Sequence, residues 1–316
     1  PLPRPNRLPL PKSWPTSETL AHWRLPPSAP DWSGGLQAHW SPGESGALER
    51  LTGFVDRMLA QYCEARDRPA IDGTSRLSPH LAFGEVSPRQ VWHAVAGREP
   101  STAGDKFLTE LGWREFSHHL SYHLGDLARR NVRPTFDTFP WSDVEADLAA
   151  WQRGRTGYPI IDAGMRELWA TGWMHNRVRM IVASFLTKDL LIDWRRGEEW
   201  FWDTLVDADP ANNPAGWQWV AGSGADVQPY FRIFNPVLQG EKFDPRGAYI
   251  RRWLPELSHL PATTIHRPWV TAGKPPPGNY PHPIVDHRVA RGRALAAFRG
   301  LERATQGVIR PVLRNV

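Results

Sequence analysis

The chain has 316 residues, of which 41% are hydrophobic and 22% charged, a mixture that excludes a disordered chain and is typical of a globular protein with a sizeable core. Lys and Arg outnumber Asp and Glu by 38 to 33, and the net charge of +5 is compatible with a polyanionic partner without requiring one. The single cysteine, Cys63, excludes an internal disulfide framework and suits a reducing cytoplasm, while the longest apolar stretch, residues 178–194, is interrupted by Arg179, Lys188 and Asp189 and predicts no membrane span.

The first 30 residues are rich in proline and lack helical periodicity, which predicts an interdomain linker that crosses a surface. Because the chain opens on Pro1 rather than Met, we expect a fragment that lacks a preceding domain. Residues 31–300 are predicted to form one helical domain, and residues 301–316 a C-terminal tail.

Apolar residues three and four positions apart dominate the middle of the chain and indicate amphipathic helices. Helices are predicted over residues 47–67, 105–124, 163–191, 198–206 and 287–304. The third of these breaks near Gly172, and Ser78 and Ser87, each followed by proline, predict the starts of two shorter helices. Strand patterns are nearly absent, so the sequence predicts an all-α fold, with neither a Rossmann motif nor a metal site.

Three hydroxyl side chains, those of Thr74, Ser75 and Ser78, stand on a turn that opens a predicted helix. Free backbone N–H groups and the helix dipole favour a phosphate at such a place. A pyrophosphate cradle and ordinary capping by Ser78 both fit this pattern.

Two predicted helices each carry polar and aromatic side chains on one face. Glu110, Trp113 and Arg114 follow the spacing i, i+3 and i+4, and Asn176 and Met180 the spacing i and i+4. A surface helix with a salt bridge would explain the first set. A pocket for a flat heterocycle would explain both sets, because the polar groups can hydrogen-bond base edges and the indole can stack.

Residues 207–219 combine two acids with amides and two indoles. The acids Asp207 and Asp209 fit three roles, which are capping of the next helix, binding of ribose hydroxyls and pairing with Arg179. The sequence leaves these three roles open.

Seven longer segments stand out, namely DGTSRLSPHLAFGEVSPRQVW, ELGWREF, GYPIIDAGMREL, TGWMHNRVRM, DLLIDW, DADPANNPAGWQW and PYFRIFNPVLQGEKFDP. In order and spacing they resemble the photolyase and cryptochrome family, and most of all its class I cyclobutane pyrimidine dimer photolyases, over residues 50–298. The resemblance implies an all-helical domain that holds FAD in a central cavity. It also implies that the N-terminal α/β domain, which would carry the antenna chromophore, is absent from this chain.

The resemblance assigns one set of residues to FAD. These residues are Tyr62, Thr74, Ser75, Arg76, Leu77, Ser78, Phe107, Arg179, Asp207, Ala208, Asp209 and Asn213. The turn at residues 74–78 would take the pyrophosphate, Arg179 would pair with Asp207, Asp209 would bind the ribose, and Asn213 would face the isoalloxazine.

A second set is assigned to the lesion and the DNA strand. Contacts to a flipped pyrimidine dimer are implied for Glu110, Asn176, Met180, Trp113 and Trp219. Contacts to DNA are implied for Arg66, Glu110, Trp113, Arg114, Asn176, Arg177 and Gln239. Glu110 would stabilise the charged dimer, while Trp113 and Trp219 would form a wedge.

Three further indoles, those of Trp217, Trp194 and Trp141, resemble the path that carries an electron from the protein surface to the photoexcited flavin. The implied reaction is electron donation from excited, fully reduced FAD to the dimer, splitting of the cyclobutane ring and return of the electron. Trp219 favours double-stranded DNA as the substrate. We expect a cytoplasmic monomer.

Other members of the family fit the sequence less well. The (6-4) photolyases resemble this chain but carry histidines at the positions of Asn176 and Met180. Cryptochromes usually replace the residue at Asn213 with Asp or Cys. The alternative function is therefore a cryptochrome-type blue-light photoreceptor without repair activity, and a third is a helical DNA-binding protein without a cofactor.

Overall fold

The computed structural model describes residues 3, 11–25, 27, 29–226, 231–270 and 279–309. Within these ranges the α-helices are α1 (Gly34–His39), α2 (Glu44–Gly53), α3 (Tyr62–Ala65), α4 (Ser78–Ala82), α5 (Pro88–Ala96), α6 (Thr102–Leu124), α7 (Glu145–Gln152), α8 (Pro159–Thr171), α9 (Asn176–Ser184), α10 (Trp194–Thr204), α11 (Asn212–Ala221), α12 (Pro236–Phe243), α13 (Ala248–Trp253) and α14 (His287–Ile309). The β pairing in the same ranges is one isolated bridge, between Ser142 and Ile192. The all-α fold expected from the sequence is confirmed.

The stretch that leads from α2 to α3 is less regular than its periodicity predicts. A π-helical turn (Phe54–Met58) and a 3-10 turn (Leu59–Gln61) lie between the two α-helices. Leu51 and Tyr62 are nevertheless buried together with one side of these turns. The apolar face that periodicity predicted is thus kept, although the hydrogen-bonding pattern changes along it.

A first hydrophobic cluster forms where this stretch packs against α5 and α6. The α6 helix begins after Ser101, whose hydroxyl accepts a hydrogen bond from the Gly104 N–H and so caps the helix. Inside the cluster, the Phe107 ring lies 4.6 Å from Phe54 and 5.3 Å from Tyr62, centroid to centroid. This packing fixes the Phe107 and Tyr62 rings at the edge of the cluster, where both residues border a cavity.

A second, larger cluster is built from α8 to α11 with α13. The chain turns between α8 and α9 at Gly172, whose φ of 67° is a left-handed conformation that glycine adopts without a steric penalty. The break predicted near this glycine is therefore confirmed. At Gly197 of α10, an added Cβ would lie 2.2 Å from the Trp217 ring, so the missing side chain is what lets α10 and α11 approach each other.

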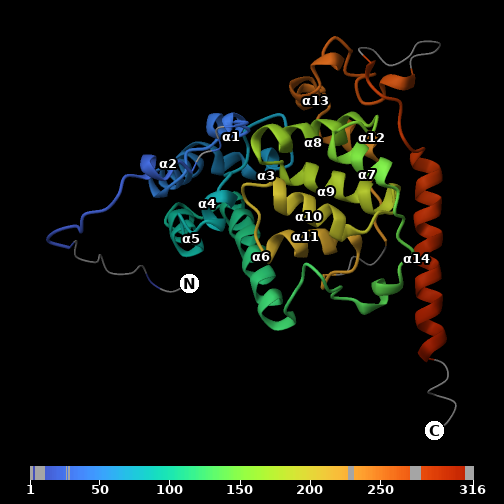
Figure 1. The fold of residues 1–316 in the computed structure, drawn as a ribbon, viewed down its shortest axis with the longest axis horizontal. Helices are drawn as coiled ribbons and strands as arrows, with labels where there is room; N and C mark the ends of the chain where they lie inside the picture. The colour runs from blue at the N-terminus through green and yellow to red at the C-terminus, as the bar shows by residue number, and fades with distance from the viewer. Residues whose placement is uncertain are drawn as a thin grey trace, which may run out of the picture.

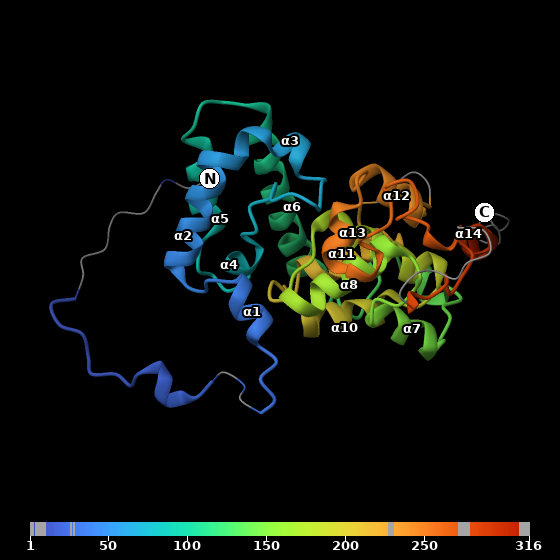
Figure 2. The same ribbon diagram turned by 90° about the horizontal axis from the view of Figure 1, so that it is seen from above.

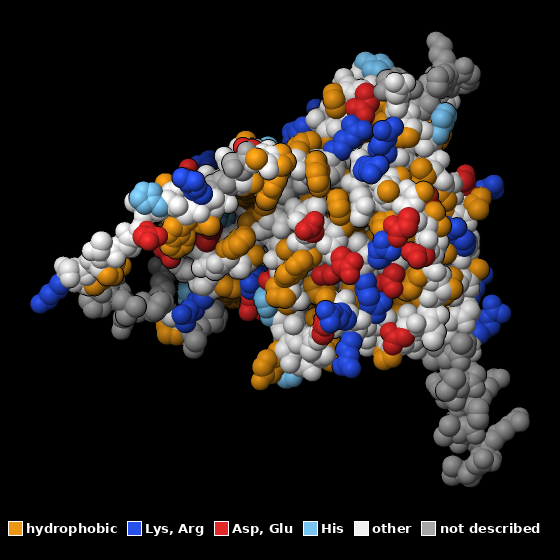
Figure 3. Space-filling model, in the orientation of Figure 1, with side chains coloured by type: hydrophobic (Ala, Val, Ile, Leu, Met, Phe, Trp, Pro, Cys, Tyr) orange, Lys and Arg blue, Asp and Glu red, His pale blue; other side chains and the backbone are white. Residues whose placement is uncertain are grey.

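Figures 1 and 2 agree that α2, α4 and α5 lie on one side of α6 and that α7 to α13 lie on the other, with α14 along the far edge. The α14 helix runs through residue 300, where the sequence predicts the boundary of the tail. Acidic and basic side chains are interspersed on the face that Figure 3 presents, so the net positive charge does not gather there. None of the helices described is long and apolar enough to cross a membrane.

Candidate functional site

A cavity of about 760 Å³ lies between the two clusters and takes walls from both. It is lined by residues of α6, α9 and α11 and by the turn before α4. It brings together these residues singled out from the sequence: Tyr62, Arg66, Thr74, Ser75, Arg76, Leu77, Ser78, Phe107, Glu110, Trp113, Arg114, Asn176, Arg177, Arg179, Met180, Asp207, Asp209, Asn213, Trp217 and Trp219. The remaining four, Ala208, Gln239, Trp194 and Trp141, are not part of its lining.

The turn at residues 74–78 presents hydroxyl groups that the fold itself does not use. The N-cap of α4 is Leu77 and no side chain caps the helix, so capping by Ser78 does not occur. Within the described part of the chain, the hydroxyls of Thr74 and Ser78 make no hydrogen bond, and both residues line the cavity. Such free hydroxyls beside backbone N–H groups suit the oxygens of a phosphate.

Arg76 completes this turn. Its φ of 50° is in the left-handed region, and its guanidinium lies over the Trp173 ring at 4.6 Å from the centroid. Its Nε atom is 3.5 Å from the Asp72 carboxylate. The stacking fixes a positive charge on the cavity wall next to the free hydroxyls.

A partly buried ion pair joins α9 to the loop before α11. Arg179 donates from Nη2 to the Asp207 Oδ2 at 2.8 Å and from Nε to the Met174 carbonyl at 2.7 Å. The Asp207 side chain is only 2% exposed, and its other oxygen, Oδ1, is buried and has no hydrogen-bond partner among the described residues. Because buried acceptors are nearly always satisfied, this oxygen is a place for a donor from a bound molecule.

Asp209 serves two purposes. Its Oδ1 accepts hydrogen bonds from the backbone N–H groups of Ala211, the N-cap of α11, and of Asn212, its first residue, at 2.9 and 2.7 Å. Asp209 thus satisfies donors at the start of the helix without being its N-cap residue. Burial disfavours the charged carboxylate, but these hydrogen bonds outweigh burial and lower its pKa. Its Oδ2 lies 3.3 Å from the His118 Nε2 and 3.9 Å from the Arg114 Nη2, on the cavity side.

The amide of Asn213 is oriented by α10. Its Nδ2 donates to the Glu198 backbone carbonyl at 3.1 Å and to the Glu198 Oε1 at 2.9 Å. Burial raises the pKa of Glu198, and the hydrogen bond from Asn213 partly opposes this rise. Since the amide nitrogen is engaged, the amide oxygen is the group that Asn213 offers to the cavity. The sequence motifs did not single out Glu198, because it lies 15 residues away on another helix.

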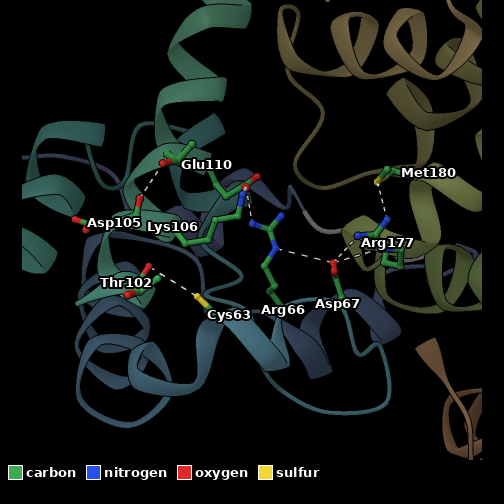
Figure 4. Close-up of polar contacts among 10 residues, drawn as sticks. Cys63, Arg66, Asp67, Thr102, Asp105, Lys106, Glu110, Arg177 and Met180 are labelled. Carbon is green, nitrogen blue, oxygen red and sulfur yellow. Dashed lines mark hydrogen bonds and ion pairs between the residues drawn. The ribbon is translucent and has the colours of Figure 1, made fainter. Parts of the chain in front are cut away.

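Figure 4 shows a chain of charged groups that runs from Lys106 and Glu110 through Arg66 and Asp67 to Arg177. Three of them, Glu110, Arg66 and Arg177, line the cavity. Glu110 pairs with Arg66 and with Lys106, not with Arg114. The Arg177 Nη2 contacts the Asp67 Oδ1 at 2.8 Å, so Asp67 holds a guanidinium to which the family resemblance assigns a DNA contact. Lys106 was not singled out from the sequence, although its i, i+4 spacing from Glu110 on a predicted helix could have indicated this ion pair.

The start of α9 places three predicted residues on the cavity. His175 caps the helix, because its Nδ1 accepts from the Arg177 backbone N–H at 3.1 Å. Burial lowers the pKa of His175 to about 4, which keeps the ring neutral and able to accept. Asn176 follows at the cavity wall, and the Met180 sulfur lies 3.8 Å from the Arg177 Nη1.

Aromatic side chains stand at the rim of the cavity and behind it. At the rim, Trp113 is 49% exposed and meets Phe116 edge to face at 5.8 Å, and Trp219 is half-buried. On the inner wall, the Trp217 ring packs edge-on against Phe201 at 5.0 Å and against Trp151 at 6.1 Å.

Two predicted electron-path residues lie away from the cavity. Trp194 is fully buried and donates from Nε1 to the Asn131 Oδ1 at 2.9 Å. Trp141 is half-buried and packs against Phe139 at 4.4 Å. Of the three indoles, Trp217 lies on the cavity wall, Trp194 is buried in the interior, and Trp141 is partly exposed to solvent.

Gln239 lies on α12, outside the cavity lining. One turn later on the same helix, the Phe243 ring stacks beneath the Arg177 guanidinium at 4.4 Å. Positions i and i+4 share a helix face, so Gln239 lies on the side of α12 that borders Arg177. Among the described residues there is no cluster of three or more side chains that could hold a metal ion.

Comparison with known proteins gives one consistent result. Residues 107–300 match the model of the FAD binding domain of DNA photolyase. A deoxyribodipyrimidine photo-lyase of Agrobacterium fabrum is 55% identical over 311 residues, which cover 95% of this chain and 65% of the relative. The corresponding protein of Escherichia coli is 50% identical over 83% of this chain and 57% of its own length.

Solved structures agree with the sequence comparison. A bacterial class III photolyase from Agrobacterium tumefaciens superimposes with a TM-score of 0.86 at 55% identity, covering 93% of this chain and 63% of its own. A cryptochrome from Synechocystis superimposes with a TM-score of 0.76 at 35% identity, covering 82% and 56%. The chain thus spans less than two thirds of the length of each of these relatives. The assignment to the class I photolyases, expected from the sequence, stays a prediction. The chain belongs to the photolyase and cryptochrome family and carries the family's FAD-binding helical domain.

Proposed function

We propose that this chain, as part of a DNA photolyase, repairs cyclobutane pyrimidine dimers in light, with FAD bound in its fully reduced form. The observation that carries the proposal is that Glu110, Trp113, Asn176 and Met180 meet in one cavity with the residues assigned to FAD. When bound and excited by light, the reduced flavin supplies one electron to the lesion and takes it back. All other steps fall to the side chains of the cavity.

The groups on the deep walls fit FAD. The hydroxyls of the turn at residues 74–78 and the Arg76 guanidinium would bind the pyrophosphate. The unpaired Asp207 Oδ1 would accept from a donor on the cofactor, and the oriented amide oxygen of Asn213 would face the isoalloxazine. With the Tyr62 and Phe107 rings on the opposite wall, the cavity offers polar groups at both ends and apolar packing between them.

The groups at the rim suit an extruded lesion. A flipped dimer leaves its stack readily, because its pairing is already weakened, and Trp113 and Trp219 would fill the space it leaves. Glu110 and Asn176 would hydrogen-bond its base edges, and Met180 would pack against it. Arg66, Arg114, Arg177 and Gln239 would contact the strand, and we propose duplex DNA as the substrate because Trp219 is present.

Trp217, Trp194 and Trp141 would deliver an electron from the surface to restore the reduced cofactor. We further propose that the protein works as a cytoplasmic monomer, as its single cysteine suits a reducing compartment. The antenna chromophore would bind to a domain outside this chain.

The second candidate function is that of a blue-light receptor, because relatives include a cryptochrome of Synechocystis and Cryptochrome-1 of Arabidopsis thaliana, the latter 44% identical over 87% of this chain. A receptor has no need of a dimer pocket, so the grouping of Glu110, Trp113 and Met180 favours repair.

The reduced protein is mixed with an oligonucleotide that contains a thymine dimer and illuminated with blue light. Splitting of the dimer should restore the ultraviolet absorbance of the two intact bases. In the Glu110→Ala variant we expect repair per absorbed photon to fall by about tenfold, the value of one lost charge-assisted hydrogen bond. Asp105→Ala, an exposed acid on the same helix, is the control. A wild-type protein that binds FAD but repairs no dimer would refute the proposal and favour the receptor.

Arg177 gives a separate prediction about the DNA strand. The Arg177→Ala variant should bind dimer-containing duplex more weakly and with a salt dependence smaller by about one unit of slope, because one phosphate contact is lost. Binding of a fluorescent duplex in the dark at several salt concentrations measures this slope. The exposed Arg299 of α14 provides the control variant Arg299→Ala, and an unchanged slope in Arg177→Ala would show that Arg177 does not contact phosphate.

A further inference from the structure

Lys106 and Glu110 lie one turn apart on α6, with the Lys106 Nζ 2.9 Å from the Glu110 Oε1. Glu110 lines the cavity, whereas Lys106, one turn earlier on the same face of α6, is not part of the lining and has a side chain that is 44% exposed. Figure 4 shows the lysine reaching along the helix to the carboxylate. The pair thus joins a group in the cavity to a charge outside it.

Arg66, which follows α3, contacts the same oxygen of Glu110 from the other side. Two cations therefore meet at Oε1. The other oxygen, Oε2, has no hydrogen bond within the described ranges, which leaves it as the acceptor that Glu110 can offer to a ligand.

Other ionisable groups also surround Glu110. Tyr62 of α3 is neutral near pH 7, because burial raises its pKa to about 12, and Asp67 lies beyond Arg66. Burial of Glu110 opposes its ionisation, but the hydrogen bonds and charges of Arg66 and Lys106 outweigh burial and lower its pKa. Both cations therefore favour the charged form of Glu110 against the effect of its burial.

The two cations are not equivalent. Arg66 is shared, since its Nε lies 3.9 Å from the Asp67 Oδ1, and Asp67 in turn holds Arg177. Both arginines line the cavity and are assigned to the DNA strand in the proposed function, so a phosphate would draw them away from these acids. Lys106 lies outside the cavity and would stay with Glu110 when DNA binds.

We propose that Lys106 is a positioning residue, which holds the Glu110 Oε1 and so keeps Oε2 turned towards the cavity when Arg66 is engaged by DNA. This inference rests on the proposed function. It goes beyond an ordinary i, i+4 pair on a helix surface, which would stabilise the helix slightly and have no effect on the cavity.

The test replaces Lys106 by methionine, which keeps the aliphatic stem and removes the charge. With carboxyl-labelled glutamate, the Glu110 resonance is assigned by its loss in Glu110→Gln and followed by carbon NMR through a pH titration of the protein loaded with FAD. We expect the midpoint to rise by about half a pH unit in Lys106→Met, as befits a half-exposed partner, and to stay near wild type in Lys106→Arg.

Dimer binding in the dark provides the second readout. Loss of Lys106 is expected to raise the pKa of Glu110. The pH below which affinity for the dimer falls should therefore be higher in Lys106→Met, while the affinity well above that pH should change little. In a Glu110→Gln background, Lys106→Met should add nothing. An unmoved titration midpoint in Lys106→Met, or an effect on binding that persists without Glu110, would overturn the inference. A wild-type protein that neither binds nor repairs dimers would instead refute the proposed function, while the NMR midpoint still tests the link between Lys106 and Glu110.

Discussion

Replacement of Trp217 by phenylalanine will almost abolish the light-driven reduction of oxidised FAD, while repair by the chemically reduced protein stays close to wild type. Trp217 is the member of the predicted electron path on the cavity wall, and Trp194 lies buried in the same hydrophobic cluster. A phenyl ring is far harder to oxidise than an indole, so the path would lose its first step. The bleaching of flavin absorbance under blue light with an external reductant, without oxygen, measures the rate.

The matched control is Trp169→Phe, which removes an indole that is 73% exposed and stacks on Trp200. We expect this variant to photoreduce normally. An equal loss in both variants would point to a general effect of indoles on the protein. Failure of repair by chemically reduced Trp217→Phe would place Trp217 in the repair step itself.

Replacement of Asp207 by alanine should destabilise the protein by about 3 kcal/mol and prevent tight binding of FAD. Removing one partner of a buried ion pair leaves the other charge uncompensated, which costs about 3–5 kcal/mol, and the lower end applies because the Arg179 side chain is 25% exposed. The orphaned acceptor Oδ1 is lost as well. Urea unfolding followed by circular dichroism, with and without FAD, gives both effects.

Asp143→Ala is the matched control for this variant. Asp143 also pairs with an arginine, Arg196, at 3.2 Å, but its side chain is 84% exposed. Exposed pairs contribute about 0–1 kcal/mol, so we expect little change in stability and none in FAD binding. Similar losses in the two variants would mean that the Arg179–Asp207 pair has no special role.

Local patterns placed two small groups of cavity residues together, whereas most of the lining was expected from the family resemblance. Helix-face spacing brought Glu110 and Trp113 together, and placed Asn176 beside Met180, because positions three and four apart must share a side. The break at Gly172 followed from the conformational freedom of glycine. These predictions succeeded because they depend on neighbours within one turn.

Contacts between distant segments could not be predicted in this way. Arg66 and Glu110 are 44 positions apart, and Asp67 and Arg177 are 110 apart, so only the packing of α3, α6 and α9 brings them together. Helix spacing alone suggested Arg114 as the partner of Glu110, since it lies at i+4. The fold instead gives Glu110 a lysine at i−4 and an arginine, Arg66, that follows α3.

The walls of the cavity belong to two separate hydrophobic cores, one around Phe107 and one around Trp217. The cavity between the two clusters removes dispersion contacts that would otherwise couple them, so that they would unfold together. A prosthetic group seated there touches both sides and adds its binding energy to their cohesion. FAD bound in the cavity would therefore stabilise the folded chain, and the chain without FAD should be cleaved more readily by proteases.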